Sequence, residues 1–493
     1  MTSKTPRHKR HFRLSPTLTI IITLLLITAL ALTFFYTPLN TKYSTMVKKD
    51  VIVGFTGAPD LQLLTKYKAT ILEVYSIIPA IHALVPQKYI ESLEKDPAIE
   101  YVSENSSIKI NSTEEEQTSG QNWPQWPLQL IEAPAAWTKS NGTGIKIALL
   151  DTGITPIDDL PFYGGSNCVN SGDTTDLDGH GTMMASLIVT QHTSPTGLRG
   201  VAPGAEVYAV KVLNDQGEGS TTHAILGIQW AVDNGMHIIS ISFGFDNHNP
   251  SLNSAINRAY SRGVLIVASA GNNGDTFWPD VVYPAKYDAV IAVSAINENK
   301  DRLRSASFGS EVELAAPGEK IWARGIGNTI VSGSGTSFAV PYVTGTAALV
   351  WGENNSLTNV EVRNILTQTA TSLHGDGRDK YFGYGLINAA AALQIAPLNS
   401  NNNTSTSTSN PSGSTNTATP STKINPQTTP TPPTITQTSP PTTFPTPTNT
   451  QTPPPTTLQT NTIIIIVSIP IILIFTVITT SIILYNKNKK QPN

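Results

Sequence analysis

Apolar and polar residues alternate with two different periods along the first part of the chain, and each period predicts a different kind of element. Two stretches place apolar residues three and four positions apart, as amphipathic helices do: "APDLQLLTKYK" at 58–68 and "QKYIESLEKDP" at 87–97. Three stretches have the alternation and composition of β-strands: "DVIVGF" at 50–55, "TILEVYSIIPAIHALVP" at 70–86, which is long enough for two strands, and "IEYVSENSSIKI" at 99–110. The order β-α-β-β-α-β predicts a small ferredoxin-like α+β domain over 47–110.

The pattern changes in the second folded region, 123–398, where near-continuous apolar runs are separated by helical stretches such as "HAILGIQWAVDNG". The runs, rich in Val, Ile, Leu and Ala, are "GIKIALLDTG" at 144–153, "AEVYAVKVL" at 205–213, "HIISISFG" at 237–244, "GVLIVASAGN" at 263–272 and "AVIAVSAI" at 289–296. Strands of this kind are typical of parallel sheets that helices cover on both faces. We therefore expect a three-layer α/β domain, in which ligands bind beyond the carboxyl ends of the strands.

Both ends of the chain carry an uncharged apolar run beside basic residues. The first run, 18–36, follows a basic tail and is close to the ~20 residues that a spanning helix needs. A signal peptide and an uncleaved anchor both remain open for 1–46. The second run predicts a transmembrane helix over 463–485, followed by a basic cytoplasmic tail at 486–493. These flanks place the residues between the two runs outside the cell membrane.

A low-complexity stretch separates the α/β region from the second apolar run. Residues 399–462 are dominated by Thr, Pro, Ser and Asn, with Lys423 as the single charge. Such a composition cannot bury enough apolar surface to offset chain entropy, and its prolines favour extended conformations. We interpret it as a surface stalk.

Composition narrows the classes of partner. The formal net charge of −3 gives no reason to expect nucleic acid as a partner. The single cysteine, Cys168, excludes an intrachain disulfide, and no second feature marks it as a nucleophile. We expect it to be an ordinary or buried thiol.

Four polar residues attract attention because they follow buried strands or begin helices: Asp151, His180, Asn272 and Ser337. Each can serve an ordinary structural purpose, since Asp and Asn are common in turns, a histidine between glycines can be a loop residue, and Ser is a preferred helix N-cap. Together they are the groups that acyl transfer to a serine needs. A base activates the hydroxyl, a buried carboxylate orients the base, and preformed donors meet the oxyanion.

The chain order Asp, His, Ser distinguishes this set from the orders found in chymotrypsin-like and α/β-hydrolase enzymes. With "DTG" at 151–153, "HGT" at 180–182, "GTSFAVP" at 335–341, "RGVAPGAEVYAVKVL" at 199–213 and "GYGLINAAAAL" at 383–393, the chain resembles the subtilisin-like (subtilase) serine proteases over roughly 47–397. The resemblance implies that Asp151 orients His180, that His180 is the general base and acid, and that Ser337 is the nucleophile. It also implies an oxyanion hole formed by the Asn272 side chain and the Ser337 backbone N–H.

The resemblance extends to substrate binding. Ser242, Phe243 and Gly244 match the segment that pairs with the substrate backbone, and Ser269, Ala270 and Gly271 match one wall of the main specificity pocket. Val282 stands at the base of that pocket, where well-known subtilisins have Gly. We expect a shallow pocket that favours small or medium apolar side chains.

No cofactor is expected for the chemistry, and the resemblance leaves a structural calcium ion open without assigning its ligands. The loop "QHTSPTGL" at 191–198 corresponds to a calcium-binding loop of the family, with Ser194 near a usual Asn ligand and Asp159 as a carboxylate donor. Asp173, Asp176 and Asp178 form an alternative acidic cluster, for which a solvated loop is the simpler interpretation.

The family resemblance also gives the first domain a role. Residues 47–110 resemble the propeptide that chaperones and inhibits these proteases, and 111–122 is then a processing linker in which we expect autocleavage, within about 108–122. The whole chain is predicted to be a self-processing zymogen of an endopeptidase that acts on proteins or peptides at the cell surface. The alternative is a stalked adhesion or assembly protein built on an inactive protease fold.

Overall fold

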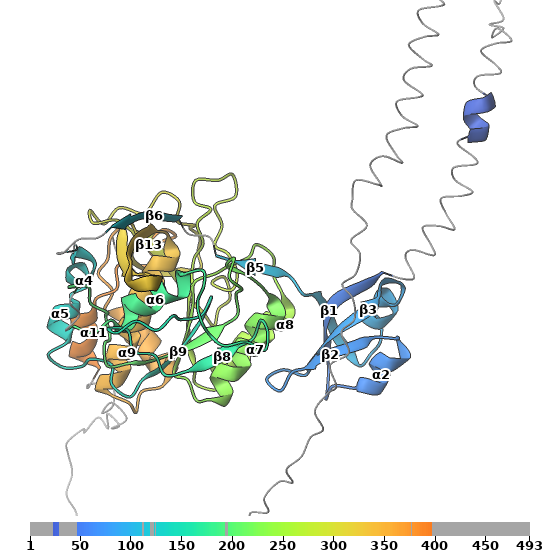
Figure 1. Cartoon of the computed structure of the whole chain (residues 1–493), viewed down its shortest axis with the longest axis horizontal. Coiled ribbons are helices and arrows are strands. Elements are labelled where there is room, and N and C mark those ends of the chain that lie inside the picture. Colours follow the sequence, from blue (N-terminus) through green and yellow to red (C-terminus); the bar gives the residue numbers. More distant parts are fainter. Residues whose placement is uncertain are drawn as a thin grey trace, which may run out of the picture. The chain divides into compact units, whose positions relative to one another are not determined.

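A computed structural model describes residues 23–28, 47–110, 113–118, 123, 125–192, 196–375 and 377–396, which belong to the same unit of the chain (Figure 1). Over these ranges no helix combines the length and apolarity needed to cross a bilayer. Of the two apolar runs, only the helical residues 23–28 belong to the described part of the chain. The predictions for the stalk at 399–462, the membrane helix at 463–485 and the tail at 486–493 lie outside it.

The N-terminal domain has the predicted order of elements, with four strands in the order β2-β3-β1-β4 among the described residues. Neighbouring strands are antiparallel. The elements are β1 (Lys48–Phe55), α2 (Leu61–Lys66), β2 (Thr70–Val74), β3 (Ala80–Pro86), the 3-10 turn η1 (Gln87–Tyr89), α3 (Ile90–Glu94) and β4 (Ile99–Glu104). One face of the sheet packs on the two helices through Val51, Val53, Leu64 and Leu93, all buried. Asp60 begins α2 by accepting from the N–H groups of Gln62 and Leu63.

The last strand predicted for this domain, 99–110, is in fact two strands. β4 ends at Glu104, and β5 (Ser107–Lys109) pairs antiparallel with β10 (Glu218–Ser220) of the larger domain. Ile108 is fully buried in the core of that domain, so burial of its side chain favours the exchange of partner. The strand is interrupted at 105–106, where Ser106 O accepts a hydrogen bond from Thr221 N at 2.9 Å.

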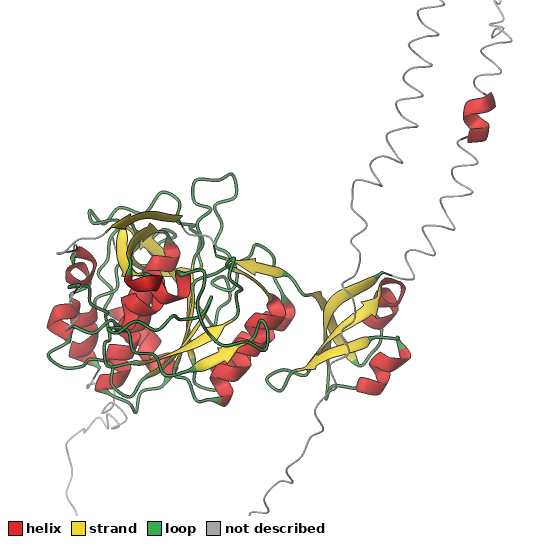
Figure 2. Cartoon of the chain, viewed as in Figure 1, coloured by secondary structure: helices red, strands yellow, loops and turns green. Residues whose placement is uncertain are grey.

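The larger domain is built on a sheet that has seven strands among the described residues, in the order β14-β13-β12-β11-β7-β9-β8 (Figure 2). All its neighbours are parallel. The strands are β7 (Lys146–Asp151), β8 (Gly165–Asn167), β9 (Glu206–Lys211), β11 (Ile238–Ile241), β12 (Leu265–Ser269), β13 (Ile291–Ile296) and β14 (Val312–Pro317). The predicted α/β class is confirmed.

Helices cover both faces of this sheet, which makes three layers. On one side lie α6 (His180–Val189), α9 (Thr336–Glu353), α10 (Asn359–Gln368) and α11 (Ala389–Ile395), and on the other α7 (Thr221–Asp233) and α8 (Pro250–Ser261). Strand β7 shows why its sequence is continuously apolar. Ile147 and Leu149 pack in the apolar core between the sheet and the helices α6 and α9. Ala148 and Leu150 pack in the core on the other face, with α7 and α8.

A second, smaller sheet lies beside the start of α9. It consists of β15 (Ile321–Arg324), β16 (Ile330–Ser334) and β6 (Thr113–Thr118), in the order β15-β16-β6, with the turn η2 (Ile326–Asn328) between the first two. The segment expected to be a processing linker therefore contains a strand. The short helices α4 (Trp126–Leu130) and α5 (Ala133–Ala136) follow it.

Candidate active site

The polar residues singled out in the sequence gather beyond the carboxyl edge of the large sheet. Asp151 is the last residue of β7, Ser242 follows β11, and Asn272 follows β12. His180 is the first residue of α6, and Ser337 is the second residue of α9. The strand ends of a parallel sheet thus bring together groups from distant parts of the chain.

Asp151 and His180 form a buried, hydrogen-bonded pair. Asp151 Oδ1 lies 2.8 Å from His180 Nδ1, and both side chains are 1% exposed. Burial lowers the pKa of the imidazole, but the pairing with Asp151 and the nearby charges of Asp178 and Asp176 outweigh it, so the pKa is raised. With Nδ1 held by the carboxylate, Nε2 is the nitrogen left to exchange protons with a substrate or nucleophile.

The glycine after His180 lets α6 begin close to the turn that follows β7. A Cβ on Gly181 would lie 2.2 Å from the carbonyl oxygen of Gly153, so a larger residue would push the helix away from Asp151. Asp176 anchors the same helix, because its Oδ2 accepts from Thr182 N at 2.8 Å and Thr182 Oγ1 at 2.7 Å. The "HGT" motif is thus a packing requirement as well as a source of histidine.

A buried lysine, which the sequence analysis missed, holds the other side of the Asp151 turn. Lys211 is 4% exposed, and its Nζ donates to Thr152 O at 2.5 Å and to Asp215 Oδ1 at 2.9 Å. Thr152 N in turn donates to Asp151 Oδ1 at 2.8 Å. The only signal in the sequence was a charged residue inside the apolar run "AVKVL".

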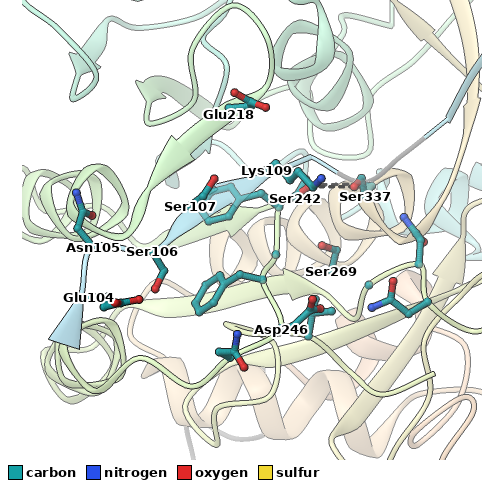
Figure 3. A pocket seen from close by; sticks show the side chains of 18 residues that line it. Glu104, Asn105, Ser106, Ser107, Lys109, Glu218, Ser242, Asp246, Ser269 and Ser337 are labelled. Carbon is teal, nitrogen blue, oxygen red and sulfur yellow. Dashed lines mark hydrogen bonds between the residues drawn. The ribbon is translucent and has the colours of Figure 1, made fainter. Parts of the chain in front are cut away.

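Ser337 is buried at the start of α9, with its hydroxyl directed at a backbone carbonyl. Ser337 Oγ donates to Ser242 O at 2.9 Å, and Ser242 Oγ donates to Ser337 O at 3.3 Å (Figure 3). The ring of His180 lies against Phe338, the next residue, with 6.4 Å between ring centroids. The hydroxyl must rotate from Ser242 to reach a base, and catalytic hydrogen bonds commonly tighten only when substrate binds.

Asn272 is fixed against the same helix start. Its Oδ1 accepts from Thr336 N at 2.9 Å and from Thr336 Oγ1 at 3.1 Å, which makes Nδ2 the donor end of the amide. Gly335, with φ +142°, lies between these groups, and a Cβ there would lie 2.9 Å from Asn272 Nδ2. The amide donor of Asn272 and the N–H of Ser337, in the first turn of α9, are therefore two donors at the same helix start that can act on one oxygen.

A cavity of about 790 Å³ opens in front of Ser337. Of the predicted substrate-binding residues, Ser242, Phe243, Gly244, Ser269, Gly271 and Val282 line it (Figure 3). Ala270 does not, because it is fully buried in the strand layer, where its carbonyl accepts from Val282 N at 2.9 Å. Its role is to hold the base of the cavity in place.

The side chain of Val282 fills the space between two glycines of this cavity. A Cβ on Gly244 would lie 2.4 Å from Val282 Cγ2, and a Cβ on Gly271 would lie 2.8 Å from Cγ1. Val282 is 8% exposed and also lines a second cavity of about 350 Å³, with Trp278 and Lys286. Val282 is thus one of three residues that line both cavities, together with Asp246 and Asn273.

Residues of the N-terminal domain occupy one side of the large cavity, which the sequence motifs did not indicate. Asn105, Ser107 and Lys109 line it (Figure 3). Gly244 N donates to Lys109 O at 3.3 Å, and Ile110 N donates to Gly217 O at 3.1 Å. This segment lies in the cavity as an added antiparallel strand between β10 and the residues after β11.

The residues considered for calcium have other partners. Asp159 Oδ1 accepts from Arg324 Nε at 3.1 Å, and both side chains are less than 10% exposed. Asp176 binds the start of α6, and Asp178 Oδ1 accepts from His180 N at 3.2 Å. In the part of the chain that the structure describes, no three His, Cys, Asp or Glu side chains converge as metal ligands. Ser194 lies outside that part.

Cys168 is partly buried, and burial raises the pKa of its thiol to about 11. A thiol with such a pKa carries almost no thiolate at neutral pH and is a poor nucleophile. Cys168 does not line the cavity in front of Ser337.

Comparison with known proteins places this chain in a family. The model of the subtilase family matches residues 142–385. The alkaline protease of Shouchella clausii is 40% identical over 326 residues, which cover 66% of this chain and 82% of that protein. Subtilisin Savinase of Lederbergia lenta is 42% identical over 271 residues, 55% of this chain and 98% of that protein. The minor extracellular protease Epr of Bacillus subtilis (strain 168) is 36% identical over 348 residues, 69% of this chain and 54% of that protein.

Proposed function

This chain belongs to the subtilase family and is a serine endopeptidase, and we propose that Asp151, His180 and Ser337 are its catalytic triad. The observation that carries this proposal is the buried pair of Asp151 and His180, 2.8 Å apart, beside the helix start that presents Ser337. Asn272 Nδ2 and the Ser337 N–H are the proposed oxyanion donors. The chemistry requires no cofactor.

The reaction follows from these groups. Ser337 Oγ attacks the peptide carbonyl while His180 Nε2 takes its proton, and the developing oxyanion accepts from Asn272 and the Ser337 N–H. His180 then gives the proton to the leaving amine, which departs and leaves an acyl-enzyme. Water then attacks the acyl-enzyme with the same proton transfers through His180, which releases the carboxylic acid product and restores Ser337. Asp151 stabilises the imidazolium throughout, in a site where burial strengthens the attraction.

We propose that the first substrate is the chain itself. On one side of Ser337, Ile110 N donates a hydrogen bond to Gly217 O. On the other side, Thr113 lies opposite Ser334 in the pairing of β6 with β16, three residues before the nucleophile. These two pairings support a scissile bond between Ile110 and Thr113, and we propose it within the window 108–122.

The pairing register supports one bond in this interval. Lys109 lies opposite Gly244 in an antiparallel pair, and a substrate strand that keeps this register would present to Ser242 the residue two positions further along. The carbonyl of Ser242 is 2.9 Å from Ser337 Oγ. We expect cleavage between Asn111 and Ser112, which would leave 47–111 as an inhibitory propeptide held in the cavity.

We further propose that the mature enzyme acts outside the cell and stays attached to the membrane. The extracellular location is supported by the relative named as an extracellular protease and by the basic flanks of both apolar runs. Cleavage after Asn111 would separate the enzyme from any N-terminal anchor, so 463–485 would be the remaining attachment. A structural calcium ion is not part of the proposal, because the carboxylate of Asp159 is already paired with Arg324.

The test compares the full-length protein with its Ser337→Ala variant. We expect the wild type to release a fragment that ends at Asn111, to digest casein and to remain in the membrane fraction after alkaline washing. We expect the variant to stay uncut and to lose at least about 10⁴-fold in turnover. Intact mass, casein hydrolysis and fractionation measure the three outcomes.

Ser294→Ala is the matched control, because Ser294 is a fully buried serine on β13 whose hydroxyl has no partner among the described residues. It should cleave and digest as the wild type does. A folded wild-type protein that remains uncut and inert would instead support the interpretation as an inactive protease fold with a binding role.

A further inference from the structure

Two residues of opposite charge face each other across the pairing of β5 with β10. Glu218 of β10 lies directly opposite Lys109 of β5 in the antiparallel register. Directly opposite residues project to the same face of such a pair, with their Cβ atoms about 4.5–5.5 Å apart. Both residues are exposed and line the cavity in front of Ser337 (Figure 3). A lysine at this position is therefore within reach of the Glu218 carboxylate.

The charges that line this cavity belong to two different domains. Among the described residues that line it, Lys109 carries the single positive charge, and it would leave with the N-terminal domain in the proposed maturation, as would Glu104. To the same described lining, the catalytic domain contributes two exposed carboxylates, Glu218 and Asp246, and no lysine, arginine or histidine. The cavity of the mature enzyme is therefore acidic, and a cationic group of a substrate would meet opposite charge there.

The backbone of Glu218 is fixed, whereas its carboxylate is not. Asn214 Oδ1 accepts from Glu218 N at 2.9 Å, and Asn214 N donates to Glu218 O at 2.7 Å. In the described part of the chain the Glu218 carboxylate forms no ion pair or hydrogen bond, Lys109 included. The strand thus holds the position of this residue, and its charge stays available to a side chain that binds opposite it.

We propose that Glu218 selects a lysine or arginine at the third position before the scissile bond of a protein substrate. The proposal rests on the proposed function and deepens it, because the substrate strand would replace β5 in the cavity and keep its register. With cleavage between Asn111 and Ser112, Lys109 is that third residue. The processing site of the chain itself would then carry the preferred charge.

The expected preference is modest because the two side chains are exposed. Exposed ion pairs are screened by water and salt, and they change an equilibrium by about two- to fivefold. A glutamate at the same substrate position would replace the attraction by a repulsion of similar size. We therefore expect a ratio of kcat/KM for Lys over Glu of about 4- to 25-fold, which should fall towards one as ionic strength rises.

The test uses the mature enzyme obtained from the full-length protein, with Glu218→Gln and Glu218→Lys variants. Glu298→Gln is the matched control, because Glu298 is an exposed glutamate after β13 that does not line the cavity. Three internally quenched peptides differ only at the third residue before the bond, which is lysine, norleucine or glutamate. Product masses locate the cut in each peptide.

We expect the wild type and Glu298→Gln to prefer lysine over norleucine and norleucine over glutamate. In Glu218→Gln the ratio of lysine to glutamate should fall close to one, and in Glu218→Lys it should invert. Equal kcat/KM values for the three peptides in the wild type, or a preference for lysine that survives Glu218→Gln, would overturn the proposal. A wild-type enzyme that cuts none of the peptides would instead contradict the proposed function on which it rests.

Discussion

Replacement of Val282 by glycine should change which side chain the enzyme accepts before the scissile bond. In the structure the isopropyl group lies within van der Waals reach of both glycine walls of the cavity, Gly244 and Gly271. A bulky substrate side chain can enter only if this group moves. Val282→Gly removes all three of its carbon atoms and joins the cavity in front of Ser337 to the space behind.

The size of the effect follows from the apolar surface that the pocket can cover. Full burial of a Phe side chain is worth about 1.5–3 kcal/mol relative to its exposure, and each 1.4 kcal/mol is a factor of ten. We therefore expect the ratio of kcat/KM for Phe over Ala peptides to rise by about 10- to 100-fold in Val282→Gly. Val282→Ala should fall between the variant and the wild type, because it removes two of the three carbon atoms.

The assay measures kcat/KM for peptide anilides that differ only in the residue before the bond: Ala, Val, Leu and Phe. Val281→Ala is the control, since Val281 is also buried and lines the smaller cavity but not the cavity in front of Ser337. The wild type should favour Ala, Val or Leu over Phe. A wild-type preference for Phe, or an unchanged ratio in Val282→Gly, would refute the argument that Val282 limits the depth of the pocket.

Two further predictions concern charge. The negative charge of Asp178 raises the pKa of His180, and the neutral imidazole is the active base. Asp178→Asn should therefore shift the acidic limb of the kcat/KM profile to lower pH. Asp173→Asn, a change at an exposed carboxylate, should leave that limb in place. Arg363 donates to Glu313 at 2.7 Å, and Glu313 is 4% exposed, so Glu313→Ala should lower the Tm of thermal unfolding by roughly 6–15 °C, corresponding to about 3–5 kcal/mol. An unmoved pH profile or an unchanged Tm would contradict the respective argument.

The large sheet could be predicted from the sequence because its strands are buried on both faces. At 147–150 of β7 successive residues enter opposite cores, so apolar residues are favoured at all four positions, and a short run of this kind between turn residues is typical of a central parallel strand. The exchange of partner by β5 could not be predicted in the same way. Alternation over 99–110 is equally compatible with one strand or two, and only the burial of Ile108 in the larger domain decides between them.

Some parts of the candidate site could likewise be predicted from the sequence, and others could not. Asp151, His180 and Ser337 stand in short motifs whose glycines are needed for close packing, so both the residues and their spacing are readable. The partners of Asp159 and Lys211 are not readable, because Arg324 lies 165 residues from Asp159 and Thr152 lies 59 residues from Lys211. Such contacts depend on how loops of the folded chain meet, and no local pattern encodes them.

The two strands that flank Ser337 impose an order on the proposed maturation steps of this enzyme. β5 and β6 both bind through the backbone, one on each side of the nucleophile, so the intact chain fills the edges that a protein substrate would use. In the proposed self-processing, the first cleavage would therefore be intramolecular. The same backbone pairing would then keep the cleaved product inhibited. Release of the two strands, and not the chemistry at Ser337, should set the rate at which activity towards other proteins appears.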